Sequence, residues 1–225
     1  MERCSAMGVV VDRLLAGRLI ALLDRLALEP QNLTAIDALD EGVDRHLADS
    51  LAALSVPEVA SGTSLLDLGS GAGFPGLPLA MARPELATTL VESERRKAAW
   101  LDRASADARN VRVVDERSEL LARSEPAAWD VVAARALAPL PVALELAAPL
   151  TAQGGHVVLW RAGRSADEET AGAWAAQDLG LVPRAVHRVH PFPEADRHLH
   201  IYEKVAPTPS RFPRRPGRAA KRPLA

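Results

Sequence analysis

The stretch of residues 64–79 constrains the fold of this chain more than any other. It reads SLLDLGSGAGFPGLPL. Its first five residues form a short apolar run with a single acid, Asp67, which is the pattern of a strand buried in a parallel sheet. Gly69, Gly71 and Gly73 follow at alternate positions, where the missing Cβ permits positive φ and the close approach of a ligand. Because an apolar helical pattern resumes directly afterwards, the stretch predicts a strand, a glycine turn and a helix that together bind a nucleotide-type ligand.

The spacing of the glycines separates two kinds of nucleotide site. A dinucleotide site follows G-x-G-x-x-G, which would place a glycine at position 74, but Phe74 stands there. G-x-G-x-G with an acid two residues ahead is the pattern of S-adenosylmethionine (SAM) methyltransferases. The simpler alternative is a tight turn without a ligand, although three alternating glycines are more than such a turn requires. We therefore expect SAM as the cofactor, held by Asp67 and the three glycines.

Strand and helix patterns alternate after the glycine turn and end in an antiparallel pair. This order predicts an α/β, Rossmann-like class I SAM-dependent methyltransferase fold with a seven-stranded, mostly parallel sheet. We expect an N-terminal helical extension over 1–60, the methyltransferase domain over 61–205 and a tail over 206–225. The expected strands cover 64–68, 87–92, 111–115, 129–133, 156–160, 182–189 and 198–205, with a turn at 154–155. The expected helices cover 9–28, 44–54, 93–108, 140–150 and 167–179.

Charge is distributed unevenly along the chain. Of its 27 basic residues, six lie in 206–225, where there is no acid, and this leaves 21 basic against 29 acidic residues in 1–205. A nucleic-acid partner would therefore have to contact local basic patches rather than a basic globule. Proline and arginine dominate the tail, and we expect it to be disordered because it carries no core-forming pattern.

Composition excludes several classes of protein. The single cysteine, Cys4, rules out a disulfide framework and a cysteine metal cluster, and it fits a reducing cytoplasm. The six histidines are scattered without the spacing of metal ligands, so we expect no metal. Charged residues interrupt the apolar ones in 1–30, and no uncharged run is long enough to span a bilayer. We expect a cytoplasmic monomer that makes no use of a membrane.

Two charged residues end strands at the edge that carries the glycine turn. Glu92 ends the strand 87–92, where an acid accepts hydrogen bonds from both ribose hydroxyls of a bound nucleoside. SAM and NAD sites share this device, so Glu92 supports a nucleoside without choosing between them. Arg135 follows the fourth strand and is our main candidate for a positioning role in catalysis, since it could pair with the SAM carboxylate or a substrate phosphate. The alternative is an arginine in a salt bridge at a sheet edge.

Seven segments of the chain, in order, match a known family. The sequence resembles the bacterial 16S rRNA guanine-N7 methyltransferases, known as the small-subunit methyltransferase G or glucose-inhibited division protein B family. The matching segments cover most of 30–205, and the glycine block with its F-P-G is fairly specific to the family. The tail, TPSRFPRRPGRAAKRPL, looks like that of actinobacterial members. The segments are NLTAI at 32–36, DRHLADSL at 44–51, LLDLGSGAGFPGLPLA at 65–80, VESERRKAAWL at 91–101, RSEL at 117–120, ARAL at 134–137 and DRHLHIYEK at 196–204.

The resemblance implies an activity and a set of cofactor contacts. It implies methyl transfer from SAM to N7 of one guanine in a conserved loop of the small-subunit rRNA. The expected partner is therefore 16S rRNA or a precursor of the small ribosomal subunit. Two positions depart from the family: Glu92 stands where relatives often have aspartate, and Arg161 stands where they often have lysine, whose point geometry an arginine does not keep. The implied cofactor contacts are Gly69, Phe74, Ser118, Glu119 and Arg135.

Basic residues near the same edge are candidates for contacts to RNA. The helix that begins near Asp44 carries Arg45 and Asp49 as i,i+4 partners, and it forms either a solvated face or a polar lip beside the cofactor cleft. The three consecutive basic residues at 95–97 likewise form either a solvated face or a phosphate contact. A structural role is the alternative for the histidines and for Arg197. The candidates are Arg45, His46, Arg95, Arg96, Lys97, Arg161, Arg197 and His198.

Elimination among methylation chemistries agrees with guanine N7. Methylation of an exocyclic amine commonly uses a [D/N]-P-P-[aromatic] loop after the fourth strand, where this chain reads ARAL. Methylation of pyrimidine carbon 5 needs a cysteine nucleophile, and Cys4 lies outside the predicted nucleotide fold. Guanine N7 has an exposed lone pair and no proton, so its methylation needs alignment but no general base.

An O-methyltransferase of another design would also pass this elimination. Three hypotheses therefore stay open. They are the rRNA enzyme, a SAM-dependent methyltransferase of a small molecule or protein, and a SAM-binding, RNA-associated factor without catalysis.

Overall fold

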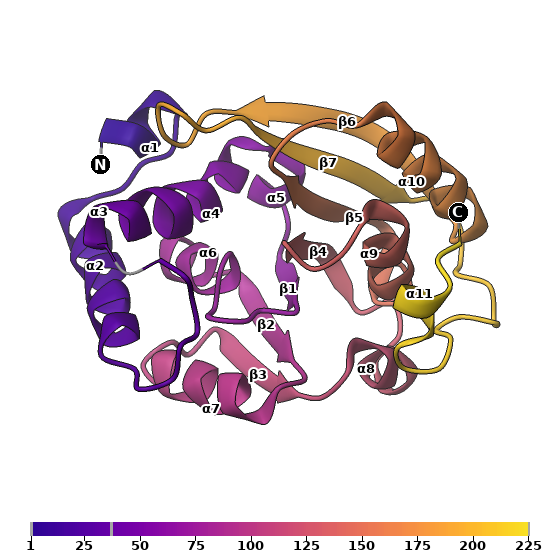
Figure 1. Cartoon of the computed structure of the whole chain (residues 1–225), viewed down its shortest axis with the longest axis horizontal. Coiled ribbons are helices and arrows are strands. Elements are labelled where there is room, and N and C mark those ends of the chain that lie inside the picture. The colour runs from indigo at the N-terminus through magenta and orange to yellow at the C-terminus, as the bar shows by residue number, and fades with distance from the viewer. Residues whose placement is uncertain (1, 37, 225) are drawn as a thin grey trace.

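A seven-stranded sheet forms the centre of the molecule, and helices cover both of its faces (Figure 1). The computed structural model describes residues 2–36 and 38–224, so positions 1, 37 and 225 lie outside this description. The strand order is β3-β2-β1-β4-β5-β7-β6, with β1 to β5 parallel and β7 antiparallel to both neighbours. The predicted α/β architecture is confirmed. The strands are β1 (Ser64–Leu68), β2 (Ala87–Glu92), β3 (Val111–Asp115), β4 (Trp129–Arg135), β5 (Thr151–Arg161), β6 (Leu181–Val189) and β7 (Arg197–Lys204).

The sheet order decides where a ligand can bind. The order reverses between β1 and β4, and α/β sheets bind ligands beyond the carboxyl ends of their strands at such a switch point. Because β7 runs antiparallel, its first residue, Arg197, lies at the same edge as the last residues of β4 and β5, Arg135 and Arg161. The centre of the sheet is apolar: Leu65 and Leu66 of β1 are both 0% exposed, as expected for a strand covered on both faces.

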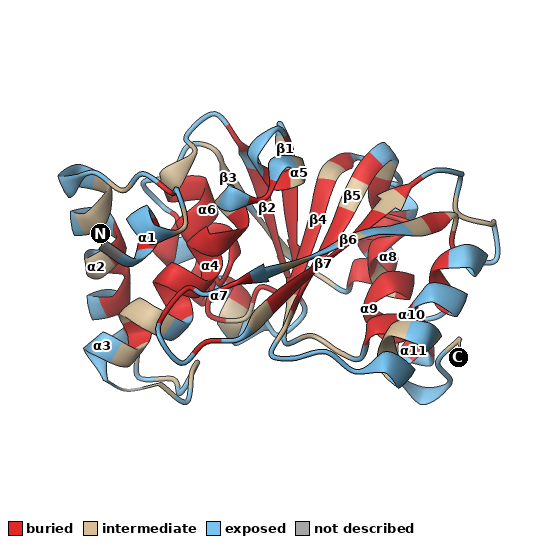
Figure 2. Cartoon of the chain, turned by 90° about the horizontal axis from the view of Figure 1, so that it is seen from above, coloured by how far each residue is buried: buried red, intermediate tan, exposed pale blue. Residues whose placement is uncertain are grey.

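The helices form one layer on each side of the sheet, with their buried faces turned inward (Figure 2). In the described residues, no helix combines the length and apolarity needed to cross a membrane. One layer contains α2 (Arg13–Ala27), α3 (Leu39–Gly42), α4 (Asp49–Leu51), α6 (Gly76–Ala82) and α7 (Arg95–Ala104). The other contains α8 (Ser118–Ser124), α9 (Leu140–Ala147), α10 (Ala166–Asp178) and α11 (Arg218–Lys221). Two further short helices are α1 (Glu2–Ala6) and α5 (Pro57–Ala60).

The first long helix, α2, begins later than its apolar pattern predicts. It starts at Arg13 because the side chain of Asp12 accepts a hydrogen bond from the N–H of Leu15 at 2.7 Å, which caps the helix. Leu14 is therefore exposed, while the leucines at 19, 22, 23 and 26 are buried. These leucines pack in one hydrophobic cluster with residues of α6 and α7. The N-terminal extension thus shares a core with the sheet, and the boundaries at 60 and 205 stay predictions.

The predicted helix over 44–54 is wrong in its geometry. The segment consists of a π-helical turn (Val43–Ala48), α4 and a 3-10 turn (Ala52–Ser55). A π-helical turn changes which side chains share a face. The predicted pair between Arg45 and Asp49 is accordingly absent from the described structure, where the Arg45 side chain contacts Glu41 at 2.8 Å.

The glycine pair at 154–155 lies inside β5, so the predicted turn at this place is wrong. β5 begins at Thr151, and its pairing with β4 shifts register between Trp129 and Val131. A bulge of this kind accommodates glycine in a strand. The two glycines therefore indicate an irregular first part of β5 and do not mark the turn that precedes the strand.

The C-terminal tail is packed, so the predicted disorder over 206–225 is wrong for the described residues 206–224. Phe212 and Ala219 are buried, and Leu224 packs against the cluster beneath α9. Arg214 forms an ion pair with Glu145, a carboxylate of α9 that is 2% exposed. Composition misled because the segment builds no core of its own. It adds single apolar residues to the core of the sheet domain, and it provides the cation that a buried acid needs.

Candidate active site

The turn after β1 is fixed by hydrogen bonds while part of its main chain stays accessible. The N–H groups of Gly69 and Ser70 both donate to the carbonyl of Val91 in β2, at 2.9 and 3.0 Å. Gly69 and Gly71 have φ values of 71° and 57°, in the region that favours glycine. A Cβ on Gly71 would meet only the Gly69 carbonyl oxygen within 4 Å among the described residues, at 3.9 Å. The turn therefore leaves room for a ligand directly against the backbone.

Gly73, the third glycine of the motif, is required by packing. A Cβ at this position would lie 2.4 Å from Leu77 Cδ1 and 3.2 Å from Leu101 Cδ2. Next to it, the indole N–H of Trp100 donates to the carbonyl of Ala72 at 3.1 Å and ties the turn to α7. The cofactor contact expected at Gly73 stays a prediction, and close packing alone explains its glycine.

Asp67 provides an unused acceptor beside the turn. It is 1% exposed, and its Oδ2 accepts a hydrogen bond from the N–H of Gly76 at 2.9 Å. Its Oδ1 is buried and finds no hydrogen-bond partner in the described part of the chain. Burial raises the pKa of the Asp67 carboxyl to about 6. A buried acceptor without a partner is unfavourable, so this atom fits a hydrogen-bond donor of a bound ligand.

Glu92 is held against the glycine turn. Its Oε2 accepts a hydrogen bond from the N–H of Gly71 at 3.0 Å, and its Oε1 accepts one from the N–H of Glu94 at 2.8 Å. Each carboxylate oxygen can accept a second bond. The carboxylate is therefore fixed in place and still able to accept the two ribose hydroxyls that the sequence predicts for it.

A pocket of about 140 Å³ lies beyond the ends of β1 and β2. Gly69, Ser118 and Glu119, three of the cofactor contacts that the family resemblance implies, line it together. Leu68, Val91 and Leu137 contribute apolar surface, which suits a flat base. Part of the remaining wall comes from the tail, which the sequence pattern did not place here. This part consists of Gly217, Ala219 and Ala220.

Phe74 is buried in an aromatic and cationic stack. The ring of His46 lies 4.3 Å from the Phe74 ring at an interplanar angle of 7°, and the Arg135 guanidinium carbon lies 5.7 Å from its centroid. His46 Nε2 and the hydroxyl of Thr34 share a hydrogen bond of 2.9 Å. Burial, and then the charge of Arg135, lower the pKa of His46 to about 4. His46 is therefore neutral at physiological pH and is not a cationic partner for phosphate.

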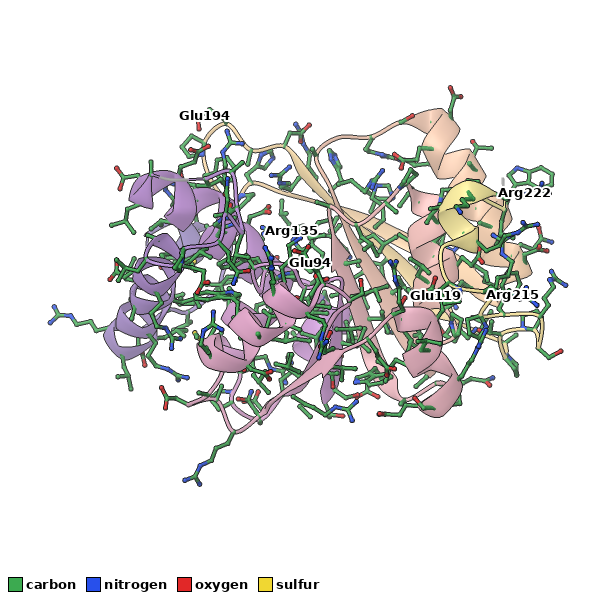
Figure 3. All side chains as sticks on the ribbon, turned by 60° about the horizontal axis from the view of Figure 1, so that its bottom comes forward. Glu94, Glu119, Arg135, Glu194, Arg215 and Arg222 are labelled. Atoms are coloured by element: carbon green, nitrogen blue, oxygen red, sulfur yellow. The ribbon has the colours of Figure 1, made fainter. Side chains whose placement is uncertain are left out.

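Asp49 organises Arg135 and Arg197, whereas the sequence predicted it only as a partner of Arg45. Its carboxylate is 1% exposed. Oδ2 accepts from Arg135 at 2.9 Å and Oδ1 accepts from Arg197 at 2.8 Å. Arg135 also donates to the carbonyl of Arg45 at 2.7 Å, and it lies near the middle of the molecule in Figure 3. The motif DRHLAD contains this acid. Only the folded chain brings it next to Arg135 and Arg197, which lie 86 and 148 positions further along the sequence.

A second pocket, of about 540 Å³, adjoins this network. It lies where β4 and β5 end and β7 begins, against the N-terminal helices. In the described structure, four arginines face two carboxylates along its lining, so the pocket is suited to an anionic ligand. Arg161 donates to the Ala138 carbonyl at 2.9 Å and pairs with Glu168. The charged lining residues are Arg45, Asp49, Arg135, Arg161, Glu168 and Arg197, joined by His46.

The structure thus brings together four of the eight RNA candidates, Arg45, Arg161, Arg197 and the neutral His46, whereas His198 does not line the pocket. The other three basic positions, 95–97, lie on α7 away from this pocket. Arg95 lies 3.6 Å from Asp115, and Lys97 pairs with Glu94 at 2.8 Å. His198 is buried in β7 next to Arg197. No group of three potential metal ligands occurs among the described residues.

A sheet of this order, with an antiparallel seventh strand inserted beside β5 and a glycine turn at its switch point, defines a class I SAM-dependent methyltransferase. A solved 16S rRNA (adenine(1408)-N(1))-methyltransferase from Catenulisporales acidiphilia shares this fold. The TM-score is 0.53 at 16% identity, over 68% of this chain and 90% of that chain. Within the class, sequence decides the family.

The sequence model of the family described as rRNA small subunit methyltransferase G matches residues 18–200, and the chain belongs to that family. A protein from Chloroflexus aggregans named ribosomal RNA small subunit methyltransferase G is 39% identical, over 100% of this chain and 96% of its own length. One from Roseiflexus castenholzii with the same name is 42% identical, over 86% of this chain and 84% of its own length.

Proposed function

We propose that the protein transfers the methyl group of SAM to N7 of a guanine in 16S rRNA. The observation that carries the proposal is the junction of two sites at one sheet edge: a bare glycine turn beside Asp67, and an arginine-lined pocket. The curated relatives are named for methylation of small-subunit rRNA, which favours this substrate over a small molecule or a protein.

The cofactor residues divide by the part of SAM that each would hold. Asp67 Oδ1 fits the ammonium group, because it is a buried acceptor that lacks a partner among the described residues. Glu92 fits the ribose hydroxyls, and the pocket formed by Gly69, Ser118 and Glu119 fits the adenine. Bound there, SAM supplies a methyl group on a positively charged sulfur, which a lone pair can attack. Gly71, Gly73 and Phe74 complete the candidate set.

The arginine pocket has the charge required for RNA. Arg45, Arg135, Arg161 and Arg197 line it, and arginine is suited to bidentate contacts with phosphate. Asp49 fixes the side chains of Arg135 and Arg197 from behind, so their directions are set before RNA binds. Arg135 touches both this network and the Phe74 stack, so we assign it a positioning role between cofactor and substrate.

The chemistry of N7 fits these side chains. Guanine N7 carries a lone pair and no proton, so its methylation requires alignment with the methyl group and no base. His46 remains neutral and is occupied by Thr34 and by the Phe74 stack. Cys4 lies buried in the N-terminal cluster, where desolvation raises the pKa of its thiol, so it is not a nucleophile for the C5 chemistry.

Methyl transfer to ribosomal particles tests the proposal. Purified protein and SAM with a labelled methyl group would be incubated with small subunits, or with naked 16S rRNA, from a strain that lacks the gene. We expect label in N7-methylguanosine. Label only in protein or metabolites would support a methyltransferase of a small molecule or protein. Tight SAM binding without transfer would support a non-catalytic factor. Either result would overturn the proposal.

Two arginine variants, one in the site and one outside it, test the site in the same assay. Arg135→Ala should lower the rate by about 100-fold, because misplacement of reacting groups has effects of this size. Arg123→Ala is the matched control, since Arg123 is exposed at the end of α8 and outside the pocket lining. Equal rates for the two variants would show that Arg135 has no positioning role.

We further expect a monomer that acts in the cytoplasm. A comparison of naked rRNA with assembled subunits in the same assay identifies the true substrate form. Mass photometry of the active protein checks the oligomeric state.

A further inference from the structure

The C-terminal tail is clamped to α9 by a buried ion pair. Arg214 donates from Nε to Glu145 Oε1 at 2.5 Å and from its terminal nitrogen to Oε2. The same terminal nitrogen donates to the carbonyl of Arg222 at 2.8 Å, which closes the chain around α11. Because Glu145 is 2% exposed, this bidentate contact satisfies an acid that would otherwise be buried alone. The tail is therefore held in a defined position.

A second anchor fixes the start of the tail. Lys204 is 3% exposed, and its ammonium donates to the carbonyl of Leu179 at 2.7 Å and to the hydroxyl of Thr208. The Thr208 hydroxyl in turn donates to the carbonyl of Ala148 at 3.1 Å. Phe212 then enters the main hydrophobic cluster. The chain thus arrives at α11 from a fixed point, beside α8 and α9 in Figure 1.

Beyond Arg214 the tail contacts a predicted cofactor residue. The N–H of Gly217 donates to Glu119 Oε1 at 2.9 Å, and Figure 3 shows Glu119 on the side of the molecule where Arg215 and Arg222 lie. Glu119 is 7% exposed and lines the 140 Å³ pocket. The same carboxylate therefore belongs to the pocket and to the docking site of the tail.

The two faces of α11 differ in chemistry. The tail residues that line the pocket, Gly217, Ala219 and Ala220, are small and uncharged. The exposed positions around them are basic, as at Arg218 and Lys221. A small uncharged wall suits the flat face of a base, whereas an RNA phosphate would need the basic side. The pocket side of the tail is therefore matched to a nucleoside.

We propose that Gly217, Ala219 and Ala220 form the outer wall of the adenine pocket, so that the tail takes part in binding SAM. The proposal rests on the cofactor position given under the proposed function. Because the docked tail supplies part of the wall that the adenosine group would contact, tail docking and cofactor binding stabilise each other. A ligand that contains adenosine binds more tightly to the docked form and raises its population.

A substitution in the wall tests this directly. Ala220 is exposed and lines the pocket, so Ala220→Leu fills space there without disturbing the core. We expect the Kd for S-adenosylhomocysteine, the demethylated cofactor, to rise about tenfold by calorimetry. Lys221→Leu, one position further along the helix and outside the lining, is the matched control and should stay within about twofold. Equal affinities for the two variants, with unchanged melting temperatures, would overturn the proposal.

The variant Gly71→Val tests the cofactor site independently of the tail. A side chain at Gly71 would fill the open space of the turn, so this variant should lose binding. If Gly71→Val loses binding and Ala220→Leu does not, the proposed cofactor site is supported and the proposed role of the tail is refuted. If Gly71→Val binds normally, the proposed cofactor position is wrong, and the proposed role of the tail, which depends on it, is refuted as well.

Protection of the tail from trypsin is an independent measurement. S-adenosylhomocysteine should slow cleavage after Arg218 and Lys221 several-fold, because a ligand that binds the docked form reduces the open population. Cleavage at an unchanged rate in saturating ligand would show that the tail and the pocket are uncoupled.

Discussion

The buried carboxylate of Asp67 lowers the stability of the fold at neutral pH, although cofactor binding is expected to need it. Its pKa of about 6 lies above the ordinary value of 3.8, so between these pH values the folded state binds more protons than the unfolded state. The free energy of unfolding therefore falls as pH rises through this window, and the buried charge destabilises the fold by about 3 kcal/mol at pH 7.5.

Replacement of this carboxylate should separate the two effects. Asp67→Asn removes the charge and keeps an acceptor for Gly76, so we expect equal or higher stability in urea at pH 7.5 and no gain at pH 4. Affinity for S-adenosylhomocysteine should fall, and its loss below pH 6 in the wild type should disappear in the variant. A variant that is less stable at pH 7.5 would contradict the assignment of a costly buried charge.

Asp49 is the residue on which the arginine pocket depends. Asp49→Ala would leave Arg135 and Arg197 without their shared carboxylate, and loss of one partner of a buried pair costs about 3 kcal/mol or more. Glu41→Ala removes the partner of Arg45 at an exposed site and should change stability by less than about 1 kcal/mol. Urea denaturation checks both values. Similar losses for the two variants would show that burial does not strengthen the Asp49 network.

At the scale of elements, the strand–turn–helix unit of β1 and α6 depends on close approach. A Cβ on Gly76 would lie 2.3 Å from Leu90 Cδ2 and 2.7 Å from Asp67 Oδ2. Gly76→Ala should therefore destabilise the protein by about 1–3 kcal/mol through overpacking. Gly163→Ala is the control, since a Cβ there meets no atom of the described residues within 4 Å. Thermal unfolding distinguishes them, and a neutral Gly76→Ala would contradict the packing described for this unit.

Elements also show how far local sequence determines structure. The bounds predicted for β1, β2 and β3 are confirmed, because each is a short apolar run between clear turn signals. The π-helical turn at Val43–Ala48 was not predicted, because a helical sequence pattern does not distinguish a π-helical turn from an α-helical one. Sequence likewise places Arg135 at a strand end, but it does not reveal that Asp49 is its partner, since 86 residues separate them.

At the scale of the whole molecule, three parts far apart in sequence meet over the carboxyl edge of one sheet. The N-terminal helices supply His46 and Asp49, the sheet supplies the glycine turn and the arginines, and the tail supplies Ala219 and Ala220. Sequence identified the sheet and its cofactor motif from local pattern. It missed the tail because a segment that docks on another core carries little apolar pattern of its own.

A crystal structure with S-adenosylhomocysteine bound tests the central claim most directly. We predict that its amino group lies at Asp67 Oδ1, that its adenine lies between Gly69, Glu119 and Ala220, and that its sulfur faces the arginine pocket. Ligand density elsewhere on the molecule, or a tail that fills the adenine pocket in the bound form, would contradict the account.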